Sequence, residues 1–202
     1  MERAAEIEEW RRGERARLIG LRLALTPEER QRASAAIEER FWALLARRPG
    51  RIIGLYWPVK GEFDPRPLAE RLAATGRAAA LPAVTGAGAP LEYRRWQEGA
   101  PMERGAHGIA EPRERDLVRP EILLVPLVGF DEACHRLGYG GGYFDRTLAA
   151  LTPPPVTIGI GFELGRLATI GPQAHDIALD FIVTEARLRE ARPQTPLLKE
   201  AP

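Results

Sequence analysis

A glycine-rich run at residues 136–146, with the sequence RLGYGGGYFDR, is the part of the chain best suited to bind a charged ligand. Four of the five positions 138–142 are glycine, and backbone without side chains can turn its N–H groups toward an anion. A helix that starts near Tyr143 would add its positive N-terminal end. Because Arg136 and Arg146 flank the glycines, the run predicts a phosphate-binding loop.

Two common phosphate-binding motifs do not fit this run. No Lys-Ser or Lys-Thr pair follows the glycines, as a P-loop requires, and Tyr143 stands where a dinucleotide-binding motif has its third glycine. The structural alternative is a flexible turn that is rich in glycine only because the chain bends sharply. The flanking arginines and Asp145 favour a binding site of a third kind.

Other residue types that carry chemistry are few. His107, His135, His175 and Cys134 lack the paired spacing of zinc ligands. Ser34, the only serine, falls inside a predicted helix without a glycine-bounded elbow. A cysteine nucleophile is conceivable at Cys134 beside His135, but adjacent residues on an extended segment point to opposite sides. The sequence therefore favours phosphate chemistry over zinc, serine or cysteine catalysis.

Short apolar runs predict the strands that must position the glycine-rich run. Such continuous runs are typical of strands buried on both faces of a parallel sheet. The predicted strands are residues 52–56, 78–81, 122–125, 156–160 and 181–183, with a more alternating edge strand at residues 91–96. Residues 97–120 form a long connection with little periodicity, and connections of that length are commonly functional.

Helical periodicity begins near the N-terminus. Apolar residues recur at helical spacing from Ile7 to Leu25, which predicts an amphipathic helix. Thr26, Pro27 and Glu29 then have the pattern of a capping box, and the second helix should run to about residue 47.

A strand–helix–strand unit follows the first predicted strand. Asp64 with Pro65 predicts the start of its helix, and Gly76 predicts its end. We therefore expect one α/β domain over residues 1–202, with a largely parallel sheet flanked by helices and with two N-terminal helices. The tail after about residue 188 should be loosely held.

The composition excludes several classes of partner. In 202 residues, 29 Lys+Arg nearly balance 28 Asp+Glu, so the net charge of +1 gives no reason to expect nucleic acid or an anionic membrane. The single cysteine forms no internal disulfide, no apolar run approaches the roughly 20 residues of a membrane span, and the start lacks a secretory signal. We expect a cytoplasmic protein that is a monomer or a weak homodimer.

A non-enzymatic alternative uses the arginine-rich first 50 residues as an RNA-binding or interaction surface. Glutamates interleave with these arginines, and the aromatic residues do not form a stacking platform. The pattern therefore favours an enzyme.

Residues 126–131, PLVGFD, together with the glycine-rich run, resemble the signature of the 5-formyltetrahydrofolate cyclo-ligase family. Further similar motifs occur in order along about residues 10–185. They are LTPEER at residues 25–30, Glu62, GIAEP at residues 108–112, His175 with Asp176, and VTE at residues 183–185.

The resemblance implies an ATP- and Mg²⁺-dependent enzyme that closes 5-formyltetrahydrofolate to 5,10-methenyltetrahydrofolate and releases ADP and phosphate. It implies that the formyl oxygen takes the terminal phosphoryl group, that the neighbouring folate nitrogen attacks the activated carbon, and that phosphate leaves. Such chemistry asks for positioning and charge neutralisation more than for a protein nucleophile.

The resemblance also implies roles for individual residues. The expected ATP-binding residues are Arg11, Arg15, Arg136, Gly138, Gly140, Gly141, Gly142, Tyr143 and Phe144. The expected residues of the folate site are Trp57, Glu62, His107, Tyr139 and Tyr143. The expected metal ligands are Asp145 and Asp176, and the expected catalytic residues are Arg136, Tyr143 and Asp145.

Several of these residues also have ordinary structural explanations. Arg11 and Arg15 lie four positions apart, so one helix face can present both, but they can equally form a solvated arginine face. Asp145 can complement the dipole at the start of a helix. Trp57 can pack in the core.

The chain departs from the family pattern at five positions. Arg11 stands where lysine is usual, Cys134 where glycine is usual, and His107 where an aromatic residue contacts the folate. Gly165 replaces a common glutamine and Pro65 a threonine. Because the last three changes are expected on the folate side, a paralogue that binds ATP but acts on another small molecule remains an alternative.

Overall fold

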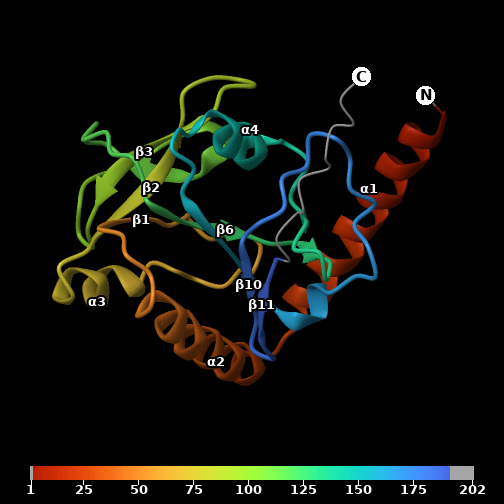
Figure 1. Ribbon diagram of the computed structural model, residues 1–202, viewed down its shortest axis with the longest axis horizontal. Helices are drawn as coiled ribbons and strands as arrows, with labels where there is room; N and C mark the ends of the chain where they lie inside the picture. The colour runs from red at the N-terminus through yellow and green to blue at the C-terminus, as the bar shows by residue number, and fades with distance from the viewer. Residues whose placement is uncertain (1, 192–202) are drawn as a thin grey trace, which may run out of the picture.

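A seven-stranded sheet forms the centre of the protein in the computed structural model, which describes residues 2–191 (Figure 1). The order of its strands is β11-β10-β9-β6-β1-β2-β3. The strands are β1 (Ile52–Gly54), β2 (Ala78–Val84), β3 (Leu91–Trp96), β6 (Ile122–Pro126), β9 (Val156–Ile160), β10 (Phe181–Val183) and β11 (Leu188–Glu190). All adjacent pairs are parallel except β2–β3 and β10–β11 at the two edges. The predicted α/β fold with a largely parallel sheet is confirmed.

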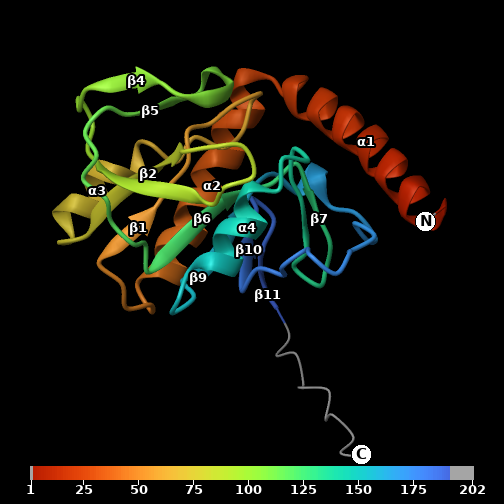
Figure 2. The same ribbon diagram turned by 90° about the horizontal axis from the view of Figure 1, so that it is seen from above.

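Helices cover both faces of the sheet. They are α1 (Glu2–Leu23), α2 (Pro27–Leu45), α3 (Leu68–Ala74) and α4 (Tyr143–Ala150). Helices α2 and α3 lie on one face and α4 lies on the other, whereas the N-terminal part of α1 extends outward (Figures 1 and 2). Within residues 2–191, no helix combines the length and apolar character needed to cross a bilayer.

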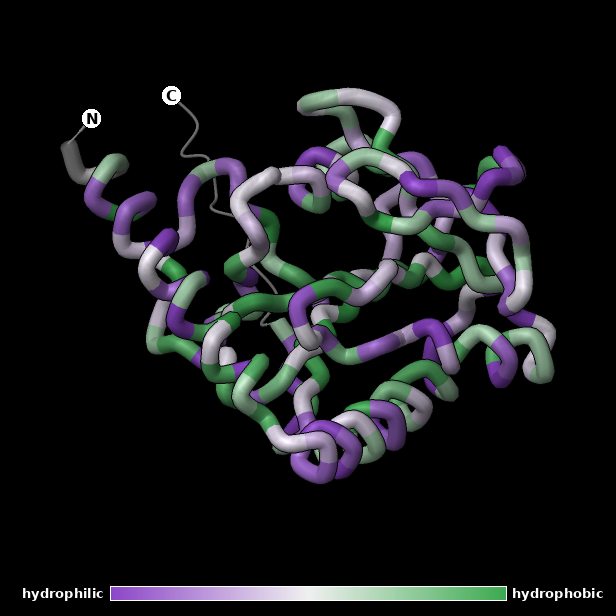
Figure 3. Tube along the Cα trace, turned by 180° about the vertical axis from the view of Figure 1, so that it is seen from behind, coloured by the Kyte–Doolittle hydropathy of each residue, from purple (hydrophilic) through white to green (hydrophobic). Residues whose placement is uncertain are grey.

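The alternation of β6 explains why the strand runs are continuously apolar. Ile122 and Leu124 belong to the core shared with α2 and α3, whereas Leu123 and Val125 belong to the core shared with α4. Successive side chains of a strand point to opposite faces, so a strand covered on both faces must be apolar at every position. Figure 3 shows hydrophobic residues along these central segments.

The start of α2 has the predicted capping box. The side chain of Thr26 accepts a hydrogen bond from the Glu29 N–H at 3.2 Å, and Glu29 Oε2 accepts one from the Thr26 N–H at 2.9 Å. Because these two bonds satisfy N–H groups that otherwise lack a partner, Thr26→Ala should lower the free energy of unfolding by about 1 kcal/mol. Urea denaturation measures this change. Ser34→Ala, inside the same helix, is the control, and an equal loss there would contradict the capping argument.

Three local predictions from the sequence differ from the structure. Helix α3 begins at Leu68 and not after Asp64, because Asp64 instead accepts hydrogen bonds from the backbone and the guanidinium of Arg66. The connection at residues 97–120 contains a hairpin of β4 (Met102–Arg104) and β5 (Ala110–Pro112), joined through the short helix η1 (Ala106–Gly108). The sequence did not predict β4 and β5, because both strands are too short and polar to show an alternation of apolar and polar residues.

The prediction of a loose tail after about residue 188 is wrong for Leu188–Glu190, which form β11. Arg189 is buried there, and its Nη1 donates to Glu163 Oε2 at 3.0 Å. This ion pair binds the end of the sheet to the short helix η2 (Glu163–Gly165). The rest of the predicted tail, from residue 192, lies outside the described residues.

The direction of chain progress along the sheet reverses between β1 and β6. From β1 the chain moves outward through β2 to β3, and from β6 it moves the other way through β9 and β10 to β11. In open α/β sheets, ligands bind outside the carboxyl ends of the strands at such a point. The loops after β1 and β6 are therefore the place to look for a site.

Candidate functional site

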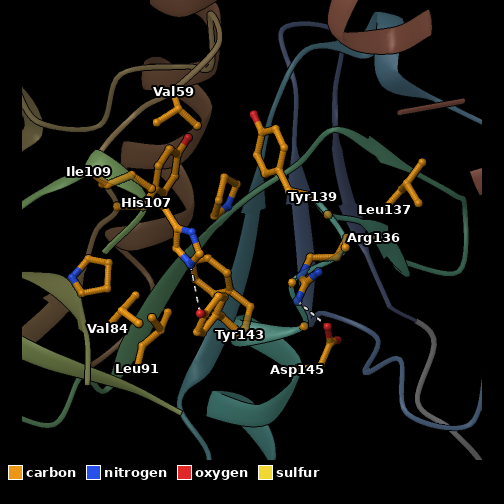
Figure 4. A pocket seen from close by; sticks show the side chains of 18 of the residues that line it. Val59, Val84, Leu91, His107, Ile109, Arg136, Leu137, Tyr139, Tyr143 and Asp145 are labelled. Atoms are coloured by element: carbon orange, nitrogen blue, oxygen red, sulfur yellow. Dashed lines mark hydrogen bonds and ion pairs between the residues drawn. The ribbon is translucent and has the colours of Figure 1, made fainter. Parts of the chain in front are cut away.

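A pocket of about 610 Å³ lies beside the loops that follow β1 and β6 (Figure 4). Every site residue predicted from the sequence lines it. These residues are Arg11, Arg15, Trp57, Glu62, His107, Arg136, Gly138, Tyr139, Gly140, Gly141, Gly142, Tyr143, Phe144, Asp145 and Asp176. They come from α1, from the loop after β1, from η1, from the glycine-rich run and from the segment before β10. The fold therefore gathers all of them in one cavity, and their individual roles stay predictions.

The glycine-rich run forms a turn that enters α4. Gly140 has φ +90° and Gly142 has φ +63°, a region that L side chains rarely adopt, so glycine is favoured at both positions. Arg15 lies against this turn, because its Nε donates to the Gly138 carbonyl at 2.9 Å. The turn alternative and the binding-site prediction are thus compatible, since the turn itself lines the pocket.

Two arginine–aspartate ion pairs stand beside the glycine-rich run. Arg136 Nη2 lies 2.9 Å from Asp145 Oδ2 (Figure 4), and Arg11 forms a second pair with Asp176. The backbone N–H of Ile177, next to Asp176, points to Asp145 Oδ1 at 3.4 Å, which brings the two acidic segments together. The sequence placed these four side chains in one site but did not predict that they pair.

The protonation of Asp176 depends on its partners. Burial alone would raise its pKa, but the hydrogen bonds from Arg11 and from the Gln173 N–H, with the charges of Arg11 and His175, lower the pKa overall. Asp176 is therefore ionised at neutral pH. Arg136 lines the pocket, where its guanidinium is open to an anionic ligand, and its Nε is buried with no hydrogen-bond partner among the described residues.

A second polar group of the pocket joins Glu62 to Tyr139 of the glycine-rich run. Tyr139 Oη donates to Glu62 Oε1 at 2.9 Å and accepts from Arg22 Nη2 at 2.6 Å. Glu62 Oε2 accepts from the Val59 N–H at 2.9 Å. Burial raises the pKa of Glu62, and the hydrogen bonds from Val59 and Tyr139, with the charges of Arg22 and Lys60, oppose this rise. The pocket thus holds a carboxylate that can accept N–H groups of a ligand.

Aromatic side chains also line the pocket. His107 Nε2 lies 3.0 Å from Tyr143 Oη, and the two rings meet edge to face (Figure 4). Trp57 is half-buried and packs against the core, and the Arg66 guanidinium lies 4.4 Å from the centre of its ring. Trp57 therefore serves core packing and lines the pocket at once.

Two of the departures from the family pattern, Cys134 and Arg11, have direct structural explanations. Cys134 adopts φ +63°, so the left-handed turn is kept despite the loss of glycine. Burial and the charge of Asp131 raise the pKa of Cys134 to about 11, which argues against a cysteine nucleophile. Arg11 uses its planar fork: Nε and Nη2 donate to the carbonyls of Ile170 and Gly171, both at 3.0 Å. A lysine cannot make this set of contacts.

The expectation that His107, Gly165 and Pro65 cluster on the folate side is wrong for two of them. Within residues 2–191, His107 lines the pocket, but Gly165 and Pro65 do not. A Cβ atom on Gly165 would lie 2.9 Å from the Val128 carbonyl oxygen, so a close backbone contact explains this glycine. Only one of the three changes touches the cavity.

Sequence reasoning missed several residues of the site. The pocket also has an apolar wall, and it has further charged residues in Lys60 and Glu111. The apolar wall consists of Val59, Pro82, Val84, Leu91, Ile109 and Pro126. Arg22, which contacts the lining residues Lys60 and Tyr139, was also missed. A signal for Arg22 exists, because steps of four and seven residues place Arg11, Arg15 and Arg22 on one helix face.

The carboxylates of the pocket fit a Mg²⁺ site that has few protein ligands. Among the described residues, no group of three or more His, Cys, Asp or Glu side chains is arranged to hold a metal ion. Asp145 and Asp176 offer carboxylate oxygens beside the glycine-rich run, where both line the pocket. Mg²⁺ is commonly bound by one or two carboxylates together with water and substrate phosphates, so these two residues fit it.

Known proteins resemble this chain over almost all of its length. The model of the 5-formyltetrahydrofolate cyclo-ligase family matches residues 7–185. The 5-formyltetrahydrofolate cyclo-ligase of Escherichia coli (strain K12) is 29% identical over 179 residues, which are 84% of this chain and 97% of that protein. The Haemophilus influenzae enzyme of the same name is 26% identical over 176 residues, which are 82% of this chain and 92% of that protein. The NMR structure of Aquifex aeolicus 5,10-methenyltetrahydrofolate synthetase has a TM-score of 0.78 and 30% identity, and the match covers 90% of this chain and 93% of that one.

Proposed function

The chain belongs to the 5-formyltetrahydrofolate cyclo-ligase family, and we propose that its pocket couples the cleavage of ATP to the closure of 5-formyltetrahydrofolate. The products are 5,10-methenyltetrahydrofolate, ADP and phosphate. One observation carries the proposal: a single cavity joins an arginine- and glycine-rich wall to a wall with a buried carboxylate and aromatic rings. The first wall suits phosphates and the second suits a pterin ring with its N–H donors.

On the nucleotide side, the residues of this chain bind and orient. Arg136 and Arg15 flank the turn of the glycine-rich run and present guanidinium groups for phosphate oxygens. Asp145 and Asp176 would hold Mg²⁺, which supplies neutralisation of phosphate charge when bound. Because Arg136 and Arg11 already pair with these carboxylates, the site is assembled before a ligand enters.

On the folate side, Glu62 accepts hydrogen bonds from the pterin, and the aromatic rings pack against it. Tyr139 and Val59 hold both oxygens of Glu62, so the carboxylate cannot rotate freely. Tyr143, at the start of α4, stands between the glycine-rich run and His107 and borders both substrates. Positioning of the formyl oxygen toward the phosphate site is the chief contribution of these groups.

The two alternative functions have less support. A paralogue with another substrate was suggested by three changes, but only His107 lies in the pocket. An RNA-binding face on α1 is disfavoured because its arginines pair with glutamates of the same helix, such as Arg12 with Glu9 and Arg17 with Glu14. Neither alternative uses the glycine-rich run and Glu62 together.

The proposed activity is tested by absorbance in the methenyltetrahydrofolate band when the protein meets 5-formyltetrahydrofolate, Mg²⁺ and ATP. We expect growth of the band that requires ATP and releases one phosphate for each product. A control without ATP should stay flat. ATP binding without product would contradict the proposal and support a paralogue with a different substrate.

The raised pKa of Glu62 predicts the acid side of the pH profile. An ionised Glu62 accepts pterin N–H groups, so kcat/KM for the folate should be full above this pKa and fall as the pH decreases through it. Since burial raises the pKa, the fall should begin at a higher pH than for an exposed glutamate. Glu62→Gln should remove this limb and lower kcat/KM for the folate by about 10–100-fold, a loss typical of a hydrogen bond to a charged group.

Glu92→Gln, at an exposed position of β3, is the control for the pH profile. The profile should be measured from stopped-flow or steady-state rates at saturating ATP. An unchanged acid limb in Glu62→Gln would show that another group controls it.

A further inference from the structure

We propose that Arg22, which does not touch the ligand space, is a positioning residue that holds Glu62 and the glycine-rich run in fixed relation to each other. The inference rests on the proposed function, because it assigns Glu62 to the folate and the run to the nucleotide. It concerns the coupling between the two walls and not a new contact with substrate.

The guanidinium of Arg22 joins three segments that are far apart in the sequence. Its Nε donates to the Lys60 carbonyl at 3.0 Å, its Nη1 to the Leu127 carbonyl at 3.0 Å, and its Nη2 to Tyr139 Oη at 2.6 Å. These acceptors belong to the loop after β1, to the residue that follows β6 and to the glycine-rich run. Arg22 is only 3% exposed. A buried guanidinium with three donors in use fixes three pieces of the pocket at once.

The turn that precedes Glu62 has a strained backbone, which contacts from Arg22 and Arg30 stabilise. Lys60 has φ +48° and Gly61 has φ +74°, so two successive residues are left-handed, and for a lysine this conformation is costly. Arg22 binds the Lys60 carbonyl, while Arg30 donates to the Gly61 carbonyl and to the carbonyl of Arg22 itself. The strained turn is thus held from both sides, and Glu62 follows directly after it.

Arg22 also sets the direction of the hydrogen bond that Glu62 receives. A guanidinium has no acceptor, so the Tyr139 hydroxyl must accept from Arg22 and donate its proton to Glu62 Oε1. The chain Arg22–Tyr139–Glu62 therefore presents Glu62 as a pure acceptor to the pocket. The charged and titratable groups that face Glu62 are Arg22, Lys60, Tyr56 and Tyr139. Among them, Arg22 is the one that also donates to backbone carbonyls, those of Lys60 and Leu127.

A double-mutant cycle separates positioning from a general structural role. Arg22→Lys keeps the charge but cannot reach three acceptors, and Tyr139→Phe removes only the shared hydroxyl. If Arg22 acts through Tyr139, each single variant should raise the KM for 5-formyltetrahydrofolate about tenfold or more, with a smaller change in the KM for ATP. The double variant should lose little beyond either single one.

Arg17→Lys is the matched control, because Arg17 lies on the same helix but is exposed and pairs with Glu14. Its kinetic constants should equal those of the wild type. Additive losses in the cycle, or equal effects on the two substrates, would overturn the proposal.

Amide hydrogen exchange tests the role of Arg22 without relying on enzyme activity. In Arg22→Lys, the amides of residues 60–62 and of residues 138–140 should exchange faster together, whereas Arg17→Lys should leave both unchanged. Unchanged exchange at both segments would overturn the inference even in an active enzyme. If the wild type itself makes no product, the proposed function fails, and the exchange result still decides whether Arg22 couples the segments. Should Arg22→Lys not fold, Tyr139→Phe gives the same readout at residues 60–62.

Discussion

Asp145→Asn should lower kcat by about 10²–10³-fold, the loss typical of removing one preorganised electrostatic group from an active site. Asp145 stands in the first turn of α4, lines the pocket and pairs with Arg136 at 2.9 Å. Asparagine keeps the volume and one oxygen that Arg136 can donate to, but it removes the charge that attracts Mg²⁺. The measurement is kcat as a function of Mg²⁺ concentration, with the affinity for ATP measured by calorimetry in the presence and absence of Mg²⁺.

The fold should survive this change. Because Arg136 keeps an acceptor, we expect the melting temperature of Asp145→Asn to stay within about 2 °C of the wild type. Asp116→Asn, which alters an exposed ion pair with Arg95, is the matched control and should retain full activity. Full activity of Asp145→Asn would contradict the metal-ligand proposal. An Mg²⁺ effect on ATP binding that is as large in Asp145→Asn as in the wild type would also contradict it.

The strands of the sheet were predictable because a strand that is buried on both faces has a continuous run of apolar residues in its sequence. Residues 122–125 are apolar at every position because Ile122 and Leu124 meet one helical layer and Leu123 and Val125 meet the other. The same logic identified β9 and β10 from runs of five and three residues. The alternating run at β3 was correctly assigned to an edge. A strand's pattern thus reveals its place in the sheet when packing alone decides the residue types.

Elements that are stabilised by contacts with distant residues have no such apolar run. The sequence suggested a tail at Leu188–Glu190, because this polar segment becomes the strand β11 through contacts with distant partners, such as those of Arg189 with Glu163 and Glu132. The hairpin of β4 and β5 is likewise short and half-exposed. Such segments gain their stability from partners that a local window of sequence does not contain.

The candidate site likewise has one part that was predictable from the local sequence and one part that was not. The glycine-rich run was found from composition, since left-handed backbone at Gly140 and Gly142 restricts the residue type. The Arg136–Asp145 pair and the contact of Tyr139 with Glu62 join residues that nothing in the local sequence relates. The resemblance to a family supplied the residues, and the fold supplied their partners. Arg22 was the exception that helix periodicity could have identified.

Arg136→Lys should lower kcat/KM for ATP by about 10²-fold, although it preserves the charge. Arg136 is buried beside the run, where Nη2 is committed to Asp145 and Nε has no partner among the described residues. The guanidinium thus offers a fixed donor toward an incoming phosphate while it stays anchored to Asp145. A lysine has a single ammonium, which must either pair with Asp145 or approach the phosphate. The loss should appear chiefly in ATP binding and in kcat, with little change in the KM for the folate.

The matched control is Arg95→Lys, at an exposed position of β3, and its kinetics should equal those of the wild type. A double variant with Asp145→Ala, which removes the acceptor altogether, separates anchoring by Asp145 from phosphate binding by Arg136. If anchoring by Asp145 is what makes Arg136 effective, Arg136→Lys should cost much less when Asp145 is already alanine, because the guanidinium has then lost its anchor. Independent, multiplying losses would mean that Arg136 binds phosphate without help from Asp145, and the ion pair would then have no part in organising the nucleotide wall.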